Sequence, residues 1–155
     1  MQLLDGKKTS EDIKQEIAAE VQKMKANGEK VPHLAAVLVG NNGASLTYVG
    51  SKVRSCEQIG FESTLVSLPE TITENELLAK IADLNEDDNL DGFIVQLPLP
   101  KHINPHKVIE AISTAKDVDG YATLSAGELM TGAPGDADAK QLRELYVKST
   151  AEQGK

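Results

Sequence analysis

The sequence predicts an α/β fold: a three-layer α-β-α arrangement around a mostly parallel sheet, with a C-terminal helix after a Gly/Pro linker. Short apolar runs alternate with longer amphipathic segments up to residue 112, which is typical of right-handed strand-helix-strand crossover units. The run 34–39 contains no polar residue, as expected for a strand that is covered on both faces in a parallel sheet.

The first expected helix covers residues 10–27. Ser10 can accept hydrogen bonds from the first free amides, the acidic residues after it suit the positive end of a helix, and Gly28 can end it. Its other face is charged, so we expect that face to be solvated. The apolar stripe recurs at helical spacing and comprises Ile13, Ile17, Val21 and Met24.

The central part of the chain continues the alternation. After the strand 34–39, a turn that contains glycine leads into a helix over 45–59, which Gly60 ends. The next strand, 61–68, alternates polar and apolar residues, which places it nearer an edge of the sheet. A helix over 73–84 follows, with its leucines and isoleucine spaced to face inward.

The last strand of the sheet is expected at 93–95. Pro98 and Pro100 follow it closely, and proline cannot donate to a sheet ladder, so the strand ends there and the loop is stiff. A helix over 104–112 has Pro105 in its first turn, where proline is tolerated.

Beyond residue 121 the alternation loosens. We divide the sequence into a domain over 1–121, a divergent Gly/Pro linker over 122–135 and a C-terminal helix over 136–155. Asp136 or Asp138 can cap that helix. We expect its narrow apolar face to cover part of the domain, and the face comprises Leu142, Leu145 and Tyr146.

Composition excludes several classes of function. The 155 residues carry a formal net charge of -8 and only 3% aromatic residues, so the clustered cations and stacking rings that bind nucleic acids are lacking. No apolar run approaches the length of about twenty residues that spans a membrane, so we expect a soluble, cytoplasmic protein with no membrane partner. Cys56 is the single cysteine, which excludes an intramolecular disulfide.

The first candidate site residues are Tyr48 and Lys52, which lie four residues apart in the helix over 45–59. That spacing puts both side chains on one helix face, where an aromatic ring and an amine could contact one small molecule. Such a pair is also common by chance, and a solvated Lys52 is the alternative interpretation. Cys56 lies one turn further on, either influenced by the amine or buried as an unreactive thiol.

Gln96 and Asp119 are the other polar candidates. Gln96 ends an apolar strand, at the edge of the sheet where parallel sheets bind ligands, and its amide either contacts a ligand or holds the proline-rich loop. Asp119 precedes Gly120 in a turn, where aspartate commonly bonds its own backbone. Surface positions without metal-binding spacing are expected for the three histidines, His33, His102 and His106.

Several motifs follow one another in order up to residue 120. They are Leu4-Asp5-Gly6, Ala44-Ser45-x-x-Tyr48-Val49-x-x-Lys52-x-x-x-Cys56-x-x-x-Gly60, Leu68-Pro69-Glu70, Asp91-Gly92-Phe93-Ile94-Val95-Gln96-Leu97-Pro98-Leu99-Pro100 and Lys116-Asp117-Val118-Asp119-Gly120. Together these motifs resemble one family, the bifunctional methylenetetrahydrofolate dehydrogenase/methenyltetrahydrofolate cyclohydrolases of one-carbon metabolism.

The resemblance implies a folate as substrate or ligand, and it implies roles for named residues. Lys52 would be the general acid/base, Tyr48 would stack on the folate, and Gln96 would hold and tune Lys52. We expect burial to lower the pKa of Lys52, with no fixed carboxylate beside its amine. The remaining substrate-binding residues would be Asp119, which grips the pterin ring, Leu97 and Pro98.

The sequence departs from the family pattern after Gly120. A His-Pro-x-Asn-x-Gly segment of the family is replaced by Ala122-Thr123-Leu124-Ser125-Ala126-Gly127, and no Gly-rich strand-to-helix fingerprint follows. We therefore expect no dinucleotide-binding domain, no NADP cofactor and no dehydrogenase activity in this chain. One wall of the folate cleft would then face water, which weakens its electrostatic effects.

Three functions stay open at this point. The first is residual methenyltetrahydrofolate hydrolysis, with folate as the small-molecule partner. The second is a truncated or engineered chimeric scaffold with little or no activity. The third is a paralogue that binds folate or another ligand without turnover. The sequence makes no prediction of the oligomeric state.

Overall fold

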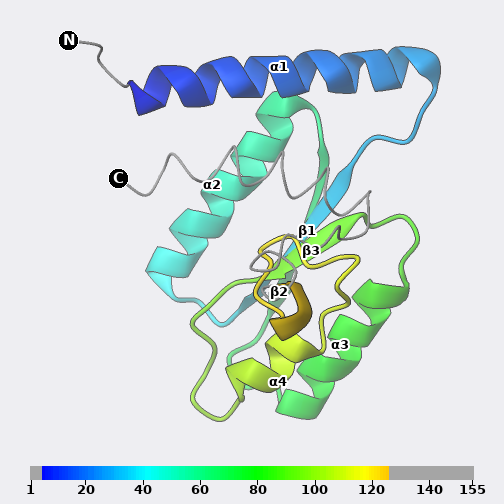
Figure 1. The fold of residues 1–155 in the computed structure, drawn as a ribbon. Helices are drawn as coiled ribbons and strands as arrows, with labels where there is room; N and C mark the ends of the chain where they lie inside the picture. Colours follow the sequence, from blue (N-terminus) through cyan, green and yellow to red (C-terminus); the bar gives the residue numbers. More distant parts are fainter. Residues whose placement is uncertain (1–4, 126–155) are drawn as a thin grey trace.

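The computed structural model of the chain describes residues 5–125 (Figure 1). The predicted alternation of helices and strands is confirmed, and no described helix is long and apolar enough to cross a membrane. The elements are α1 (Gly6–Asn27), β1 (His33–Val39), α2 (Gly43–Ile59), β2 (Glu62–Leu68), α3 (Glu74–Glu86), β3 (Gly92–Val95) and α4 (Pro105–Glu110).

The strand β1 lies in the centre of a parallel sheet with the order β2-β1-β3. It pairs with β2 from His33 to Val39 and with β3 from Leu34 to Val37. The outer position of β2 confirms the prediction of a strand near the edge, and its exposed and half-buried residues alternate in part. Because all three strands run in the same direction, their carboxyl ends share one edge, which we call the carboxyl edge.

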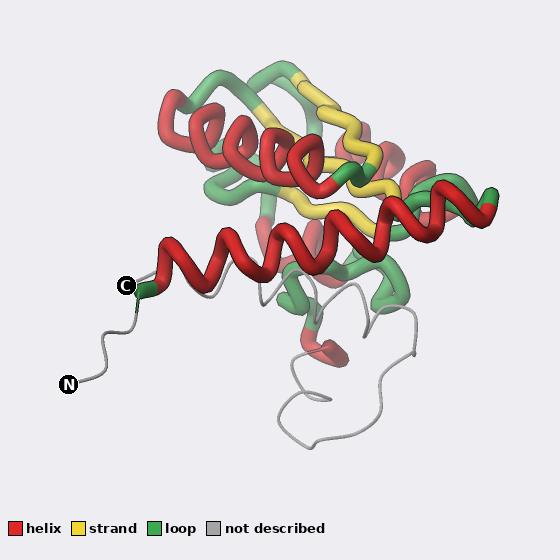
Figure 2. Tube along the Cα trace, turned by 90° about the horizontal axis from the view of Figure 1, so that it is seen from above, coloured by secondary structure: helices red, strands yellow, loops and turns green. Residues whose placement is uncertain are grey.

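Helices cover both faces of the sheet, which confirms the three-layer prediction. In Figure 2, α1 and α2 are the two long helices in front of the strands. On that face, Val49 of α2 packs with Leu38 of β1 and Ile94 of β3. The helix α1 joins this layer because its Ile17 packs in one cluster with Ile59 at the end of α2.

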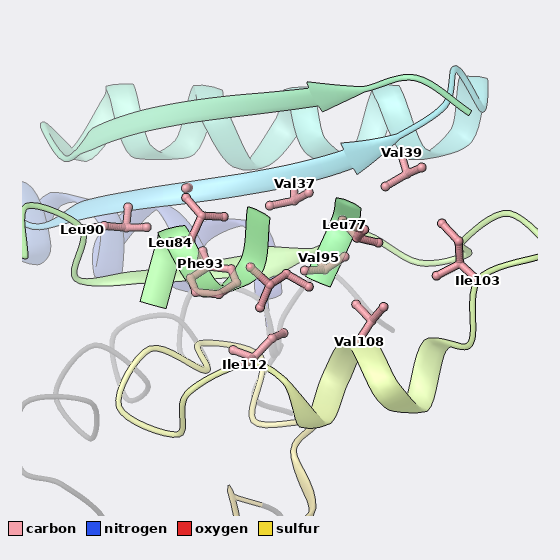
Figure 3. Packing of buried hydrophobic residues seen from close by; sticks show 12 residues of the cluster. Val37, Val39, Leu77, Leu84, Leu90, Phe93, Val95, Ile103, Val108 and Ile112 are labelled. Carbon is pink, nitrogen blue, oxygen red and sulfur yellow. The ribbon is translucent and has the colours of Figure 1, made fainter. Parts of the chain in front are cut away.

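The larger core lies between the opposite face of the sheet and the helices α3 and α4 (Figure 3). Val37 and Phe93 of the sheet meet Leu77 of α3 and Val108 of α4, and all four side chains are almost completely buried. Burying each such side chain contributes about 1.5–3 kcal/mol. The other buried members are Ala35, Val39, Ile81, Leu84, Leu90, Val95, Ile103 and Ile112.

The helix α1 begins one turn earlier than the sequence predicts. Asp5 is its N-cap, and the Asp5 carboxylate accepts a hydrogen bond from Lys8 N at 3.1 Å. Because Asp5 already satisfies an amide of the first turn, Ser10 lies inside the helix, and the prediction of a Ser10 cap is wrong. Gly28 ends the helix as predicted, with a left-handed φ of 72° that glycine adopts without strain.

Residues 122–125 pack on the domain instead of leaving it. Ala122 and Ser125 are buried, and the backbone is helical from residue 123 to residue 125. These four residues are the start of the linker that the sequence predicts over 122–135, and the boundary of that linker stays a prediction. The rest of that linker and the predicted helix over 136–155 lie outside the described residues.

Gly92→Ala should destabilise the fold, because a Cβ atom at Gly92 would lie 2.4 Å from Val118 Cγ2 and 3.3 Å from Lys116 O. Overpacking of this kind costs about 1–3 kcal/mol, which urea denaturation followed by circular dichroism can measure. Gly43→Ala is the matched control, since nothing lies within 4 Å of a Cβ atom there. Equal losses of stability in the two variants would contradict the packing argument.

Candidate functional site

The helix α2 begins at the carboxyl edge because the chain turns directly after β1. Gly40 has a φ of 78°, which favours glycine, and a Cβ atom there would lie 3.3 Å from Glu70 Cβ. Asn42 Oδ1 then accepts hydrogen bonds from Ala44 N at 3.0 Å and from Ser45 N at 3.3 Å. This cap starts the helix slightly earlier than the sequence predicts.

Tyr48 and Lys52 lie on the same face of α2, as their spacing predicts. The Lys52 Nζ atom lies over the Tyr48 ring, 5.0 Å from its centroid, which is within the range of cation–π contacts. The side chain of Lys52 is only 15% exposed, whereas Tyr48 is 48% exposed. The interpretation of Lys52 as a solvated surface residue is therefore wrong. The Tyr48 ring remains accessible to solvent beside this mostly buried lysine.

Asp119 brings a carboxylate to Lys52 from a distant part of the sequence. Its Oδ1 atom lies 3.6 Å from Lys52 Nζ, and its side chain is 22% exposed. The expectation that no fixed carboxylate lies beside Lys52 is therefore wrong. The reason is topological, because Asp117 forms a parallel bridge with Phe93 of β3, which carries the next residues toward the carboxyl edge.

Two opposing effects act on the protonation of Lys52. Burial is the larger, and it lowers the pKa of the amine below the usual lysine range because a charged ammonium group loses hydration. The negative charge of Asp119 acts in the opposite direction. The net result is an amine that releases its proton more readily than a surface lysine, which general acid/base chemistry requires.

Cys56 follows one turn after Lys52 and is half-buried. Burial raises the pKa of the Cys56 thiol, and the nearby amine of Lys52 reduces that effect without reversing it. A thiol with a raised pKa carries little thiolate near neutral pH, so this position favours the interpretation of Cys56 as unreactive.

Gln96 lies where β3 ends, and its side chain is tied to its own loop. Its backbone N donates to Val37 O at 2.9 Å, and its Nε2 atom donates to Leu97 O at 2.6 Å. These bonds support the interpretation of Gln96 as a residue that holds the loop, and its role beside Lys52 stays a prediction. Leu97 is half-buried and Pro98 is exposed at the same edge.

The aspartate that forms the turn is Asp117, and the sequence analysis did not single it out. Asp117 is 5% exposed, its Oδ1 atom accepts from Gly120 N at 2.9 Å, and its Oδ2 atom accepts from Ala122 N at 3.0 Å. Aspartate at the first position of a turn with glycine at the fourth is a common pattern, so the spacing Asp117-x-x-Gly120 was an available signal. Because Asp117 accepts the hydrogen bonds from the backbone amides of the turn, the side chain of Asp119 can face Lys52.

Two of the three histidines contact neighbouring elements through their rings. His33 Nε2 lies 2.8 Å from Thr64 Oγ1, and His102 Nε2 lies 2.8 Å from Ile72 O. His102 and His106 are exposed, as predicted, and His33 is half-buried. Within residues 5–125, no group of three or more His, Cys, Asp or Glu side chains could hold a metal ion.

The helices that follow the strands all begin with side-chain caps. Their first amides are the groups that would bind a phosphate, and side-chain caps already occupy amides at all three helix starts. The capping residues are Asn42 for α2, Thr73 for α3 and Asn104 for α4. Within residues 5–125, these three helix starts therefore offer a phosphate fewer unoccupied amides than uncapped helices would.

Comparison with known proteins identifies relatives of this domain. Residues 4–119 match the family described as "Tetrahydrofolate dehydrogenase/cyclohydrolase, catalytic domain". "Bifunctional protein FolD" of Flavobacterium johnsoniae is 76% identical over 129 residues, which are 83% of this chain and 44% of that protein. The protein of the same name from Bacteroides fragilis is 58% identical over 134 residues, which are 86% of this chain and 46% of that protein.

Solved structures agree with the sequence comparison. The bifunctional enzyme FolD, methylenetetrahydrofolate dehydrogenase/cyclohydrolase, from Campylobacter jejuni has 43% identity and a TM-score of 0.82, over 94% of this chain and 54% of that chain. FolD of Trypanosoma brucei, complexed with NADP cofactor and inhibitor, has 28% identity and a TM-score of 0.80, over 88% of this chain and 46% of that chain.

The match extends along most of this chain but only part of each relative. The chain spans less than half the length of the curated relatives from Flavobacterium johnsoniae and Bacteroides fragilis. The family match covers the elements from α1 to α4 and ends at Asp119, which is the carboxylate beside Lys52. The chain thus belongs to the tetrahydrofolate dehydrogenase/cyclohydrolase catalytic domain family.

Proposed function

We propose that this chain binds a folate at the carboxyl edge and hydrolyses methenyltetrahydrofolate there as a cyclohydrolase-type enzyme. The observation that carries the proposal is the withdrawn amine of Lys52, which lies between an accessible aromatic ring and a carboxylate. Its distances are 5.0 Å to the Tyr48 ring centroid and 3.6 Å to Asp119 Oδ1. A flat ligand on the ring would bring its reacting carbon near a group that can move protons.

Lys52 is the general acid/base in this proposal. Its neutral amine accepts a proton from the water molecule whose oxygen bonds to the methenyl carbon. The resulting ammonium returns that proton to a ring nitrogen as the bond from this nitrogen to the carbon breaks. The new hydroxyl group loses its own proton to solvent as the carbonyl forms, so one proton is released in each turnover and Lys52 is regenerated.

The other residues bind and orient the substrate in this proposal. Tyr48 stacks on the folate, and its exposed ring supports this role because a buried ring could not meet a ligand. Asp119 accepts hydrogen bonds from the amino-pyrimidinone edge of the pterin, as a carboxylate with two oxygens can do. Gln96 holds the loop and tunes Lys52, and this loop supplies Leu97 and Pro98 to the folate site.

Folate binding without turnover is an alternative, and one observation favours it. The carboxylate of Asp119 lies close enough to Lys52 to stabilise the ammonium form, which cannot act as a base. A scaffold with little or no activity is the other alternative. Calorimetric titration with a folate analogue, followed by the absorbance decay of methenyltetrahydrofolate, separates the three. Binding with absorbance decay supports hydrolysis. Binding without decay supports folate binding alone, and the absence of both supports the scaffold.

Lys52→Met should lower the cyclohydrolase rate by about 10²- to 10⁴-fold and leave folate binding nearly unchanged, because it removes the proton carrier and keeps most of the side-chain volume. Absorbance decay measures turnover, and calorimetry measures binding. Lys23→Met is the matched control, since Lys23 is 68% exposed and pairs with Glu20 on the outer surface of α1. Loss of binding with unchanged turnover per bound ligand would contradict the assignment.

The rate at limiting substrate should rise with pH through an inflection below the ordinary lysine value of about 10.4, because burial lowers the pKa of Lys52. Asp119→Asn should move the inflection to lower pH, since removing the negative charge removes an effect that raises this pKa. The profile is measured after subtraction of the spontaneous hydrolysis in buffer. An inflection that stays in place or moves upward in Asp119→Asn would exclude Lys52 as the titrating base.

A further inference from the structure

We propose that Asp117 and Glu110 are positioning residues that hold the loop 117–123 in the conformation in which Asp119 faces Lys52. The proposal concerns two carboxylates outside the predicted site. It rests on the proposed function only for its catalytic consequence, because the geometry of the loop can be tested without turnover.

The loop starts from a fixed position on the sheet. Phe93 N of β3 donates to Lys116 O at 3.0 Å, and Phe93 and Asp117 form a parallel bridge. Val118 is 5% exposed and packs with the apolar cluster beneath α2. It can approach β3 this closely only because Gly92 has no side chain. The residue before Asp119 is therefore held from two sides.

Hydrogen bonds to Asp117 fix the second half of the loop. Both oxygens of this buried carboxylate accept backbone hydrogen bonds, one from Gly120 N and one from Ala122 N. Gly120 has a left-handed φ of 68°, so the chain reverses directly after Asp119. A buried carboxylate needs such partners to offset its lost hydration, and these amides also fix the direction in which the chain leaves Asp119.

Glu110 supplies the second anchor from α4. One of its oxygens accepts hydrogen bonds from Thr123 N at 3.1 Å and from the Thr123 hydroxyl. These bonds lower the pKa of Glu110, so the carboxylate is charged at neutral pH and its bonds are charge-assisted. The α4 layer is thereby tied to the segment that follows Asp119.

The contact between Asp119 and Lys52 cannot by itself fix the carboxylate. Its 3.6 Å distance is longer than a normal hydrogen bond, and both side chains retain some exposure to water. The hydrogen bonds that the backbone donates at residues 120, 122 and 123 are shorter, at 2.9, 3.0 and 3.1 Å. The position of Asp119 therefore depends on the loop, and Asp117 and Glu110 determine the loop.

The test measures the pKa of Lys52 by NMR in protein labelled with 13C at the lysine ε-carbon, with the resonance assigned from Lys52→Arg. Asp119→Asn gives the downward shift that results from losing the carboxylate. Asp117→Asn should give a downward shift of the same sign, because one retained oxygen cannot accept both amides and Asp119 moves away. The double variant should shift no further than Asp119→Asn alone, since both changes remove the same interaction.

Glu110 provides an independent arm if Asp117→Asn fails to fold. Glu110→Ala should lower the pKa of Lys52 part of the way, whereas Glu110→Gln keeps the acceptor oxygen and should stay near the wild-type value. Circular dichroism melts identify the variants that are folded. The proposal is overturned if the folded Asp117 and Glu110 variants leave the pKa of Lys52 unchanged, or if the shifts of Asp117→Asn and Asp119→Asn add in full.

This readout separates the proposal from the proposed function. Absence of cyclohydrolase turnover in the wild-type chain would reject the proposed function and leave the NMR comparison intact. Where turnover is present, Asp117→Asn should move the inflection of the rate profile to lower pH, as Asp119→Asn does. A role of Asp117 in stability alone would lower the melting temperature without moving that inflection.

Discussion

The burial of β1 on both faces and along both edges is the constraint on which this domain depends. Its residues from Ala35 to Val39 are nearly inaccessible to water, so apolar side chains must cover them from two helix layers. The chain passes from β1 to β2 on one side of the sheet and from β2 to β3 across to the other side. Right-handed crossovers therefore place α2 and α3 on opposite faces.

That topology also explains where the candidate site lies. The neighbouring strands β1 and β3 are followed by helices on opposite faces, so their carboxyl ends form a topological switch point, the usual ligand position in such sheets. Gly40 and Gln96 mark the two sides of this switch point. Lys52 reaches it from α2, and Asp119 reaches it because residue 117 pairs beside β3.

The electrostatics of the site follow from partial burial. Burial removes hydration from the Lys52 amine and lowers its pKa. The nearby Asp119 carboxylate raises this pKa, but by less than burial lowers it. The two aspartates of the motif Asp117-Val118-Asp119 have different contacts. The Asp117 carboxylate is buried and accepts hydrogen bonds from backbone amides, whereas the Asp119 carboxylate lies beside the Lys52 amine. The exposed ring of Tyr48 borders the amine, and an accessible aromatic surface is common where a ligand binds.

Local signals in the sequence were sufficient for the α/β class, the element order and the pairing of Tyr48 with Lys52, because hydrophobic period and helical spacing are properties of short segments. These local signals misplaced the N-cap of α1. Both Asp5 and Ser10 have side chains that can cap a helix, and the helix begins after Asp5. The local signals also gave no sign that Ala122 is buried with its backbone N–H bonded to Asp117, because that bond forms only in the folded loop.

Only the tertiary structure decided the chemistry of Lys52. The sequence places Asp119 far from Lys52 along the chain, and no local pattern reveals that the bridge between Phe93 and Asp117 brings the carboxylate to 3.6 Å from the amine. It also distinguished the two aspartates, since which one is buried depends on the packing of Val118 against the sheet. Short-range spacing thus determined which residues could act, and long-range pairing determined which charges they meet.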